Sequence, residues 1–264
     1  MNLDFAVTAF LPIITGLLYF FMAFEVKRTS KYRSIMFGEI GFKKLEIAFI
    51  MFAIYFITRP LQNITGPHPW PMIINSARQF FLMSVIAPSI LVAIFHWVPA
   101  TSGAPKSSTF AAYIIGSLMG VIFVLVNTIA ATSSKIIYSW GIISMYDPVW
   151  FASGVPLIQL VIIHLICQFV SPVGFLLLAA AYVKHRRHNY QLTHIYNLMP
   201  KKWRYLEASL MILAGSFLAA GTAVVFGSYY TYVWVIYFIG AIISGAFELI
   251  GIKLPPREIP DDLK

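Results

Sequence analysis

Long apolar stretches alternate with short polar connections along almost the whole chain. A helix needs about 20 mostly apolar residues to cross the hydrocarbon core of a bilayer. Seven segments fit this requirement, the second of them only when it borrows neighbouring residues. They cover residues 5–24, 45–58, 79–98, 110–131, 156–183, 205–226 and 230–251. Because these runs are continuously apolar and do not alternate, they favour helices over the strands of a membrane barrel.

We therefore expect an all-α fold, a polytopic membrane protein built as a bundle of seven transmembrane helices. Residues 1–252 form this domain, and residues 253–264 follow it as a cytoplasmic tail or linker. No basic residue precedes the first span, which argues against a cleavable signal peptide. Since seven is an odd number, the two ends of the domain are expected on opposite sides of the membrane.

The composition supports the same class. The chain is 59% hydrophobic and only 11% charged, whereas about a quarter of the residues in a soluble domain are charged. A water-soluble globule is therefore excluded, and so is a disordered chain, which needs low hydrophobicity. The formal net charge is +9. Cytoplasmic connections of membrane proteins carry an excess of Lys and Arg, so this charge does not indicate a nucleic-acid partner.

The distribution of basic residues gives the orientation. When the N-terminus is placed outside, all of the 19 Lys and Arg fall in inner connections except Arg59, Arg78 and Lys135. Such an uneven distribution is the positive-inside pattern. We expect a multi-pass protein of the cell membrane, with its N-terminus outside, its C-terminus in the cytoplasm and membrane lipids as its surroundings.

Catalytic signatures are missing from the sequence. It contains no H-E-x-x-H pair, no G-x-S-x-G elbow and no glycine-rich phosphate loop. We therefore lean against an enzyme and expect neither a cofactor nor a bound metal. The single cysteine, Cys167, excludes an intrachain disulfide. Four acidic residues are predicted at the inner ends of spans, close to Lys or Arg: Glu25, Glu46, Glu207 and Glu248.

The histidines fall into two groups. His185, His188 and His194 share one basic inner loop, which we interpret as a solvated segment in contact with anionic lipid headgroups. His68 and His164 are both predicted in the outer half. A metal or haem shared between these two outer histidines is an alternative to the expectation of no cofactor.

Polar residues gather in the outer half, where we predict a ligand pocket. Arg59 and Arg78 flank a proline-rich connection, and His164 and Gln168 stand one helical turn apart on a single stripe. Guanidinium groups suit a carboxylate, phosphate or sulfonate. The predicted ligand-binding residues are Arg59, His68, Arg78, Asn127, His164 and Gln168. Alternatively, the helices only hydrogen-bond one another through these groups, at about 0.6 kcal/mol per contact.

Two further segments bear on function. The connection over residues 131–151 is too apolar to extend into water, so we predict an interfacial lid over the mouth of the bundle. The seventh span carries small residues, including Gly240 and Ser244, against which a neighbouring helix can slide. It leads directly into the cytoplasmic tail.

The favoured function is a sensory or ligand-binding membrane domain with an outward-facing pocket. Its ligand is expected to be a small amphipathic or anionic molecule or a lipid, and its output a cytoplasmic partner reached through the seventh helix. Seven-helix receptors and the membrane input domains of bacterial sensors share this topology, but a shared fold does not assign a function. The alternatives are a transporter or channel for a small solute, and a membrane subunit or lipid-handling enzyme that binds quinone or haem.

Overall fold

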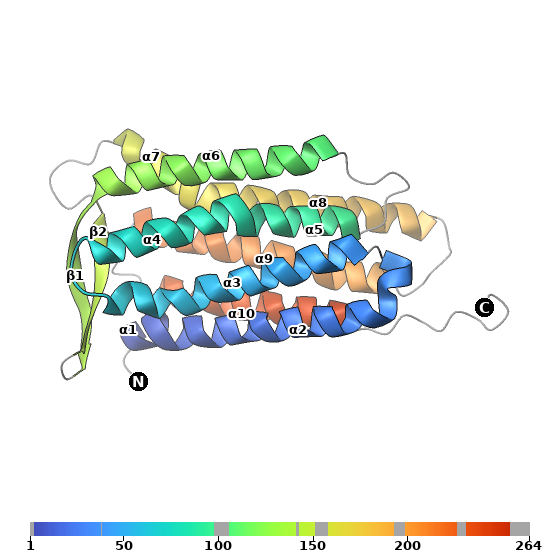
Figure 1. Cartoon of the computed structure of the whole chain (residues 1–264), viewed down its shortest axis with the longest axis horizontal. Helices are drawn as coiled ribbons and strands as arrows, with labels where there is room; N and C mark the ends of the chain where they lie inside the picture. The colour runs from blue at the N-terminus through green and yellow to red at the C-terminus, as the bar shows by residue number, and fades with distance from the viewer. Residues whose placement is uncertain are drawn as a thin grey trace.

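The computed structural model of the chain is a bundle of long helices that lie side by side, with a short β-hairpin across one end (Figure 1). The first described helix begins at the hairpin end of the bundle, and the last one ends at the opposite end. The structure describes residues 3–37, 39–97, 106–140, 143–150, 158–192, 199–225 and 231–253.

Several of the long rods are built from consecutive helical segments. The first rod joins α1 (Leu3–Phe5), the π-helical turn η1 (Ala6–Phe10) and α2 (Leu11–Phe37). It is followed by α3 (Glu39–Ile64), and then by α4 (Trp70–Phe81), η2 (Leu82–Ile86) and α5 (Ala87–Trp97). The remaining helices are α6 (Lys106–Ala130), α7 (Ile158–Leu165), η3 (Ile166–Val170), α8 (Ser171–Leu192), α9 (Met199–Val225) and α10 (Thr231–Lys253).

Among the described residues, six helices are long and apolar enough to cross a membrane. They cover Leu3–Thr29, Gly41–Ile64, Trp70–His96, Ser108–Ala130, Ile158–His188 and Tyr232–Ile252. The predicted helical, multi-pass membrane architecture is confirmed at this level. The 27-residue α9 is not one of these six, although it packs between α8 and α10 inside the bundle.

The helices on either side of the proline-rich connection are longer than the predicted spans. α3 continues past Thr58 through Pro60 to Ile64, and α4 already begins at Trp70. Pro60 removes one backbone donor, but such a loss is tolerated in a membrane helix because neighbouring groups satisfy the freed carbonyl. The predicted long loop is therefore reduced to residues 65–69, and both flanking arginines lie inside helices.

The apolar connection after α6 forms an antiparallel hairpin of β1 (Ala131–Trp140) and β2 (Ile143–Trp150). It lies across the end of the bundle, where a lid was predicted, but the strands themselves were not predicted (Figure 1). The Asn63 side chain donates to the Tyr146 carbonyl oxygen at 2.7 Å, and Ser134 accepts from the backbone N–H of His68 at 2.7 Å. These bonds tie the hairpin to the C-terminal end of α3 and to the loop that follows.

An aromatic core joins α2, α3, α9 and α10. The rings of Tyr19 and Phe52 meet edge to face at 4.7 Å, and Phe56 stacks on Tyr19 at 5.7 Å. Tyr237 of α10 reaches Phe217 of α9 at 5.4 Å. Such pairs prefer offset or edge-to-face geometry, so this core fixes how the four helices pack.

Small residues set the closest approach between helices. A Cβ atom at Gly116 of α6 would collide with the backbone carbonyl of Met83, and one at Gly240 of α10 would collide with the Ser216 side chain of α9. Gly215, by contrast, has open space around it. In the sixth predicted span it is therefore Ser216, and not Gly215, that meets the neighbouring helix.

We predict opposite effects for two glycine-to-alanine changes. Gly116→Ala should lower the free energy of unfolding by about 1–3 kcal/mol, because a backbone carbonyl cannot move aside for the new methyl group. Gly215→Ala should be neutral or stabilise by up to about 1 kcal/mol, because alanine favours the helix and meets nothing. Thermal unfolding of both variants in the same detergent measures the difference. Equal melting temperatures would contradict the close packing of α6 on η2.

Candidate functional site

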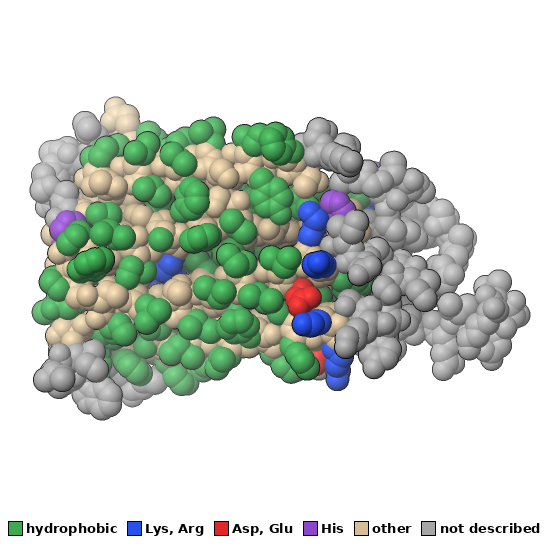
Figure 2. Space-filling view, in the orientation of Figure 1, with side chains coloured by type: hydrophobic (Ala, Val, Ile, Leu, Met, Phe, Trp, Pro, Cys, Tyr) green, Lys and Arg blue, Asp and Glu red, His purple; other side chains and the backbone are tan. Residues whose placement is uncertain are grey.

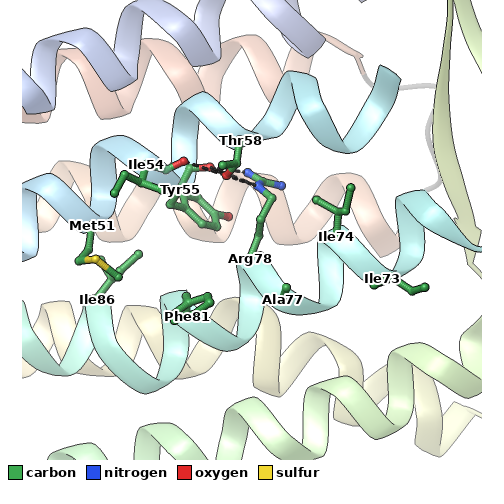
Figure 3. Close-up of a pocket in the computed structure, with 10 residues that line it drawn as sticks. All are labelled: Met51, Ile54, Tyr55, Thr58, Ile73, Ile74, Ala77, Arg78, Phe81 and Ile86. Carbon is green, nitrogen blue, oxygen red and sulfur yellow. Dashed lines mark hydrogen bonds between the residues drawn. The ribbon is translucent and has the colours of Figure 1, made fainter. Parts of the chain in front are cut away.

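Arg78 of α4 is held against the neighbouring helix α3, and its side chain is only 7% exposed. Its Nε and Nη2 atoms both donate to the Tyr55 carbonyl oxygen, at 3.2 and 2.9 Å. Nε also donates to the Thr58 hydroxyl at 3.2 Å (Figure 3). Nη1 donates to Gln62 Oε1 at 2.7 Å. All these acceptors are neutral groups of α3, so they orient the guanidinium without cancelling its charge.

Arg59 approaches the same amide from α3 itself. Its Nη1 donates to Gln62 Oε1 at 3.4 Å, so both buried guanidiniums share one acceptor. Each guanidinium also lies over an aromatic ring: Arg59 over Trp234 of α10 at 5.4 Å, and Arg78 over Tyr55 at 4.5 Å. Cation–π contacts of this kind strengthen when water is excluded. Gln62 therefore joins the two arginines into one unit that spans α4, α3 and α10.

A groove with a volume of about 330 Å³ runs between α3 and α4, and Arg78 lines it. The groove opens on the side of the bundle, since Ile54, Ile73 and Phe81 on its walls are exposed. The other lining residues are Met51, Tyr55, Thr58, Ile74, Ala77 and Ile86 (Figure 3). The surface around it is a broad apolar band, within which a small basic patch is visible (Figure 2).

This groove contains fewer of the predicted residues than the predicted pocket. Of the six predicted ligand-binding residues, Arg78 lines it and the other five do not. The reason is the helical extension of α3 and α4. Because Arg59 and Arg78 lie within helices instead of at their ends, Arg78 faces the α3–α4 seam and Arg59 faces α10.

The other four predicted residues occupy separate settings. The Asn127 amide of α6 donates to the Ser76 hydroxyl of α4 at 2.7 Å, so it joins two helices. His164 is fully buried, with its ring 5.1 Å from that of Phe123 on α6, and Gln168 is buried in η3. His68 is exposed in the loop between α3 and α4. Within the described part of the chain, no three His, Cys, Asp or Glu residues are grouped to hold a metal ion.

Tyr55, Thr58 and Gln62 were missed as parts of the site. They lie three and four residues apart, which places them on one face of a helix, and that face meets Arg78. The signal was present in the sequence. However, a span that is predicted to end at residue 58 leaves Gln62 in a loop, so the spacing does not predict that Gln62 shares this face.

Buried amides line the interior beside the arginine pair. Asn75 and Gln79 stand one turn apart on α4, and Gln79 donates to the Tyr55 hydroxyl at 3.1 Å. Among the described residues, neither polar atom of the Asn75 amide has a hydrogen-bond partner, and the same holds for Gln79 Oε1 and Gln168 Oε1. Such groups are the usual partners of buried water, so the half of the bundle nearer the hairpin has polar groups in its interior.

The opposite end of the bundle carries a band of charged side chains (Figure 2). Glu25 pairs with Arg28 at 2.8 Å, and Glu207 of α9 pairs with Arg187 of α8 at 3.1 Å. Glu248 differs from these paired acids in its setting. It is buried and accepts a hydrogen bond from Ser209. His194 of the predicted basic loop lies outside the described residues.

The arrangement offers two complementary chemistries in one place. The walls of the groove are aliphatic and aromatic, and Arg78 brings to its margin a guanidinium, a group that suits a carboxylate or phosphate. Comparison with protein-family models, with curated proteins and with solved structures finds no match to this chain.

We predict that Gln62→Leu destabilises the protein by about 1–3 kcal/mol, because it removes the buried acceptor that both guanidiniums use. Thr128→Val is the matched control, since the Thr128 hydroxyl bonds only to a carbonyl of its own helix and is exposed. Thermal unfolding of the purified variants measures both effects. A Gln62→Leu protein as stable as the control would show that the shared amide does not hold the arginines.

Proposed function

We propose that this chain is a sensory, ligand-binding membrane domain whose ligand is an amphipathic acid that enters the α3–α4 groove from the lipid. The observation that carries the proposal is the Arg78 guanidinium, fixed by neutral acceptors in the wall of an otherwise apolar groove that opens sideways. The ligand class follows from that pairing: a long apolar chain that ends in a carboxylate or phosphate.

Arg78 is suited to capture such a headgroup because its position is already fixed. Its bonds to Tyr55 and Gln62 hold the guanidinium plane before any ligand arrives, and preorganisation of this kind reduces the entropy lost on binding. Arginine is also the basic residue that pairs with planar anions through two parallel hydrogen bonds. In a site with little water, such charge-assisted bonds are stronger than at a surface.

Seven spans are part of the proposal, with α9 as the seventh. This helix has 27 residues and packs between α8 and α10. The described chain begins and ends at opposite ends of the bundle, as an odd number of crossings requires (Figure 1). The charged band at the end opposite the hairpin supports a cytoplasmic location for that end. The N-terminus and the hairpin are then outside.

A route for the signal is available through Arg59. A headgroup that binds Arg78 competes with Gln62 for its donors, and Gln62 is also bound by Arg59, which lies over Trp234 of α10. Since α10 continues to Lys253 at the charged end, a small displacement of this helix can reach a cytoplasmic partner. A ligand drives such a shift only by binding the two positions unequally.

We predict the orientation with two single cysteines. Thr65→Cys lies in the exposed loop between α3 and α4, and Lys43→Cys is exposed at the other end of α3. In intact cells, an impermeant thiol reagent should label only Thr65→Cys, and lysis should add Lys43→Cys. The native Cys167 is buried, so the unmodified protein provides the blank. Labelling of Lys43→Cys alone in intact cells would invert the orientation.

We predict that the protein in nanodiscs of neutral lipid binds a fluorescent long-chain fatty acid, and binds the corresponding fatty alcohol more weakly. Arg78→Gln should weaken fatty-acid binding roughly tenfold to a hundredfold, because a hydrogen bond to a charged group contributes about 1.5–3 kcal/mol. Lys135→Gln, which removes an exposed charge at the same end of the bundle, should leave binding unchanged. Fluorescence titration gives the dissociation constants.

Two outcomes would reject this ligand class. One is equal binding of the fatty acid and the fatty alcohol by the wild type, which would mean that the guanidinium does not distinguish a carboxylate from a hydroxyl group. The other is unchanged fatty-acid binding by a folded Arg78→Gln protein. Ala77→Leu provides a second variant, since the larger side chain obstructs the groove while the bonds of Arg78 to α3 remain. It should weaken both ligands alike.

A further inference from the structure

Glu248 is a buried carboxyl group at the meeting point of α2, α9 and α10, far along α10 from the arginine pair. Its side chain is 4% exposed. The Ser209 hydroxyl of α9 donates to Glu248 Oε2 at 3.3 Å and lies 3.0 Å from the Ser244 hydroxyl of α10. The Ser244 hydroxyl in turn donates to the Ser209 carbonyl oxygen at 2.9 Å. These groups form a small oxygen-rich cluster between helices.

The second carboxyl oxygen, Oε1, has no hydrogen-bond partner among the described residues. In that part of the chain no Lys or Arg lies within ion-pair distance of Glu248 either. An isolated buried carboxylate is strongly unfavourable, and such groups are neutralised by a proton or paired with a cation. The cluster therefore accommodates the acid only when a positive species neutralises it.

The surrounding helices supply little charge of their own. From α2, the titratable group near Glu248 is Tyr19, whose hydroxyl donates to the Ala241 carbonyl oxygen at 3.3 Å. From α9, Tyr205 packs on Phe247, the residue before Glu248, with ring centroids 5.8 Å apart. The η1 segment, which also touches α10, has no ionisable residue.

Three ion pairs form among the charged residues of α2, α3, α8 and α9 toward the same end. Glu25 pairs with Arg28 within α2, Lys27 of α2 lies 3.9 Å from Glu46 of α3, and Glu207 pairs with Arg187. Lys184 and Arg204 are exposed, and Arg186 lies over the ring of Tyr182. Glu248, by contrast, is buried inside the bundle.

We propose that Glu248, with the Ser209 and Ser244 hydroxyls, forms a binding site for a monovalent cation, either a proton or an alkali metal ion, between α9 and α10. Both occupants satisfy the same chemistry, because each neutralises the carboxylate at Oε1. A proton attaches to the carboxyl itself, and an alkali ion uses the carboxylate together with lone pairs of the serine oxygens. The site is independent of the Arg78 groove, and its failure would leave the ligand proposal intact.

The site has a structural consequence for α10. The Ser209–Ser244 bonds hold α10 against α9 at the depth of Glu248, and Gly240 packs on Ser216 one turn away. Loss of the cation would leave a charged group in this seam, and like any buried charge it would favour hydration and separation of the two helices. Ionisable residues inside membrane helices are rare and mark functional positions, and occupancy of this one controls the packing of the last helix.

The test measures thermal unfolding of the full chain in one detergent, across pH and in sodium, potassium or choline chloride at equal ionic strength. It compares the wild type with Glu248→Gln, which keeps the shape but cannot lose a proton, and with Glu46→Gln as the matched control at the same end of the bundle. Infrared difference spectra of the wild type report whether the carboxyl is protonated. This measurement does not require any variant to fold.

If a proton occupies the site, the wild type and Glu46→Gln lose several degrees of melting temperature as pH rises, because the buried seam stabilises the neutral acid. A protonated-carboxyl band disappears over the same pH range. If an alkali ion occupies the site, sodium or potassium raises the melting temperature over choline by several degrees. Glu248→Gln loses either dependence. The proposal is overturned if the wild type and Glu248→Gln respond alike to pH and salt, or if the wild type shows neither a protonated carboxyl nor an alkali-ion effect.

Ser209→Ala offers a second route if Glu248→Gln does not fold. It removes a hydroxyl that contacts the carboxyl but keeps the acid. For an alkali ion, this variant should need several-fold more salt to reach the same stabilisation. For a proton, the infrared titration should shift in midpoint without disappearing. An unchanged titration and an unchanged salt requirement would place the cation elsewhere.

Discussion

The need to neutralise or solvate charge inside an apolar bundle governs the organisation of this protein. Arg78 is carried by α4 into the side of α3, where the Tyr55 carbonyl and the Gln62 amide take its donors. A lipid-facing surface offers no water for this purpose, so the protein must provide the acceptors itself. The position of Gln62, the length of α3 and the seam between the two helices all follow from that requirement.

The same requirement explains why the candidate site lies on the flank of the bundle. Arg78 lines the groove at the seam between α3 and α4, with its guanidinium turned toward the Tyr55 carbonyl and Thr58 of α3 (Figure 3). The acceptors that it meets on α3 are neutral groups, to which an anion would add a charge–charge interaction. A wholly interior arginine would instead bind only solutes that had already entered the bundle from water.

The helical membrane class could be predicted from the sequence because apolar runs of this length form few other structures than membrane-spanning helices. The sequence was less informative about where helices end. Pro60 and Pro71 suggested a long loop, yet the structure keeps Pro60 within α3 and starts α4 next to Pro71. A proline lowers helix propensity locally. Whether the helix continues past it depends on tertiary partners for the backbone groups that the proline leaves without a bond. No pattern in one sequence reports those partners.

The candidate site depended on the same distinction. Arg78 was predicted as a ligand-binding residue from its type and its side of the membrane, and the structure places it in the groove. Its grouping with His164 and Gln168 assumed that polar residues at similar depth converge. Depth follows from position along a span, but direction around a helix follows from packing. Asn127 shows this, since its amide is used by Ser76 of the adjacent helix.

α10 is the element that connects the two unusual charges. Trp234 in the first turn of α10 lies under Arg59. Glu248 lies 14 positions later in the cluster with Ser209, a separation of about 21 Å at 1.5 Å per residue. Between them the helix packs through Gly240 and the aromatic ring of Tyr237. The partner of Arg59 and the buried acid therefore lie about four turns apart on the same helix.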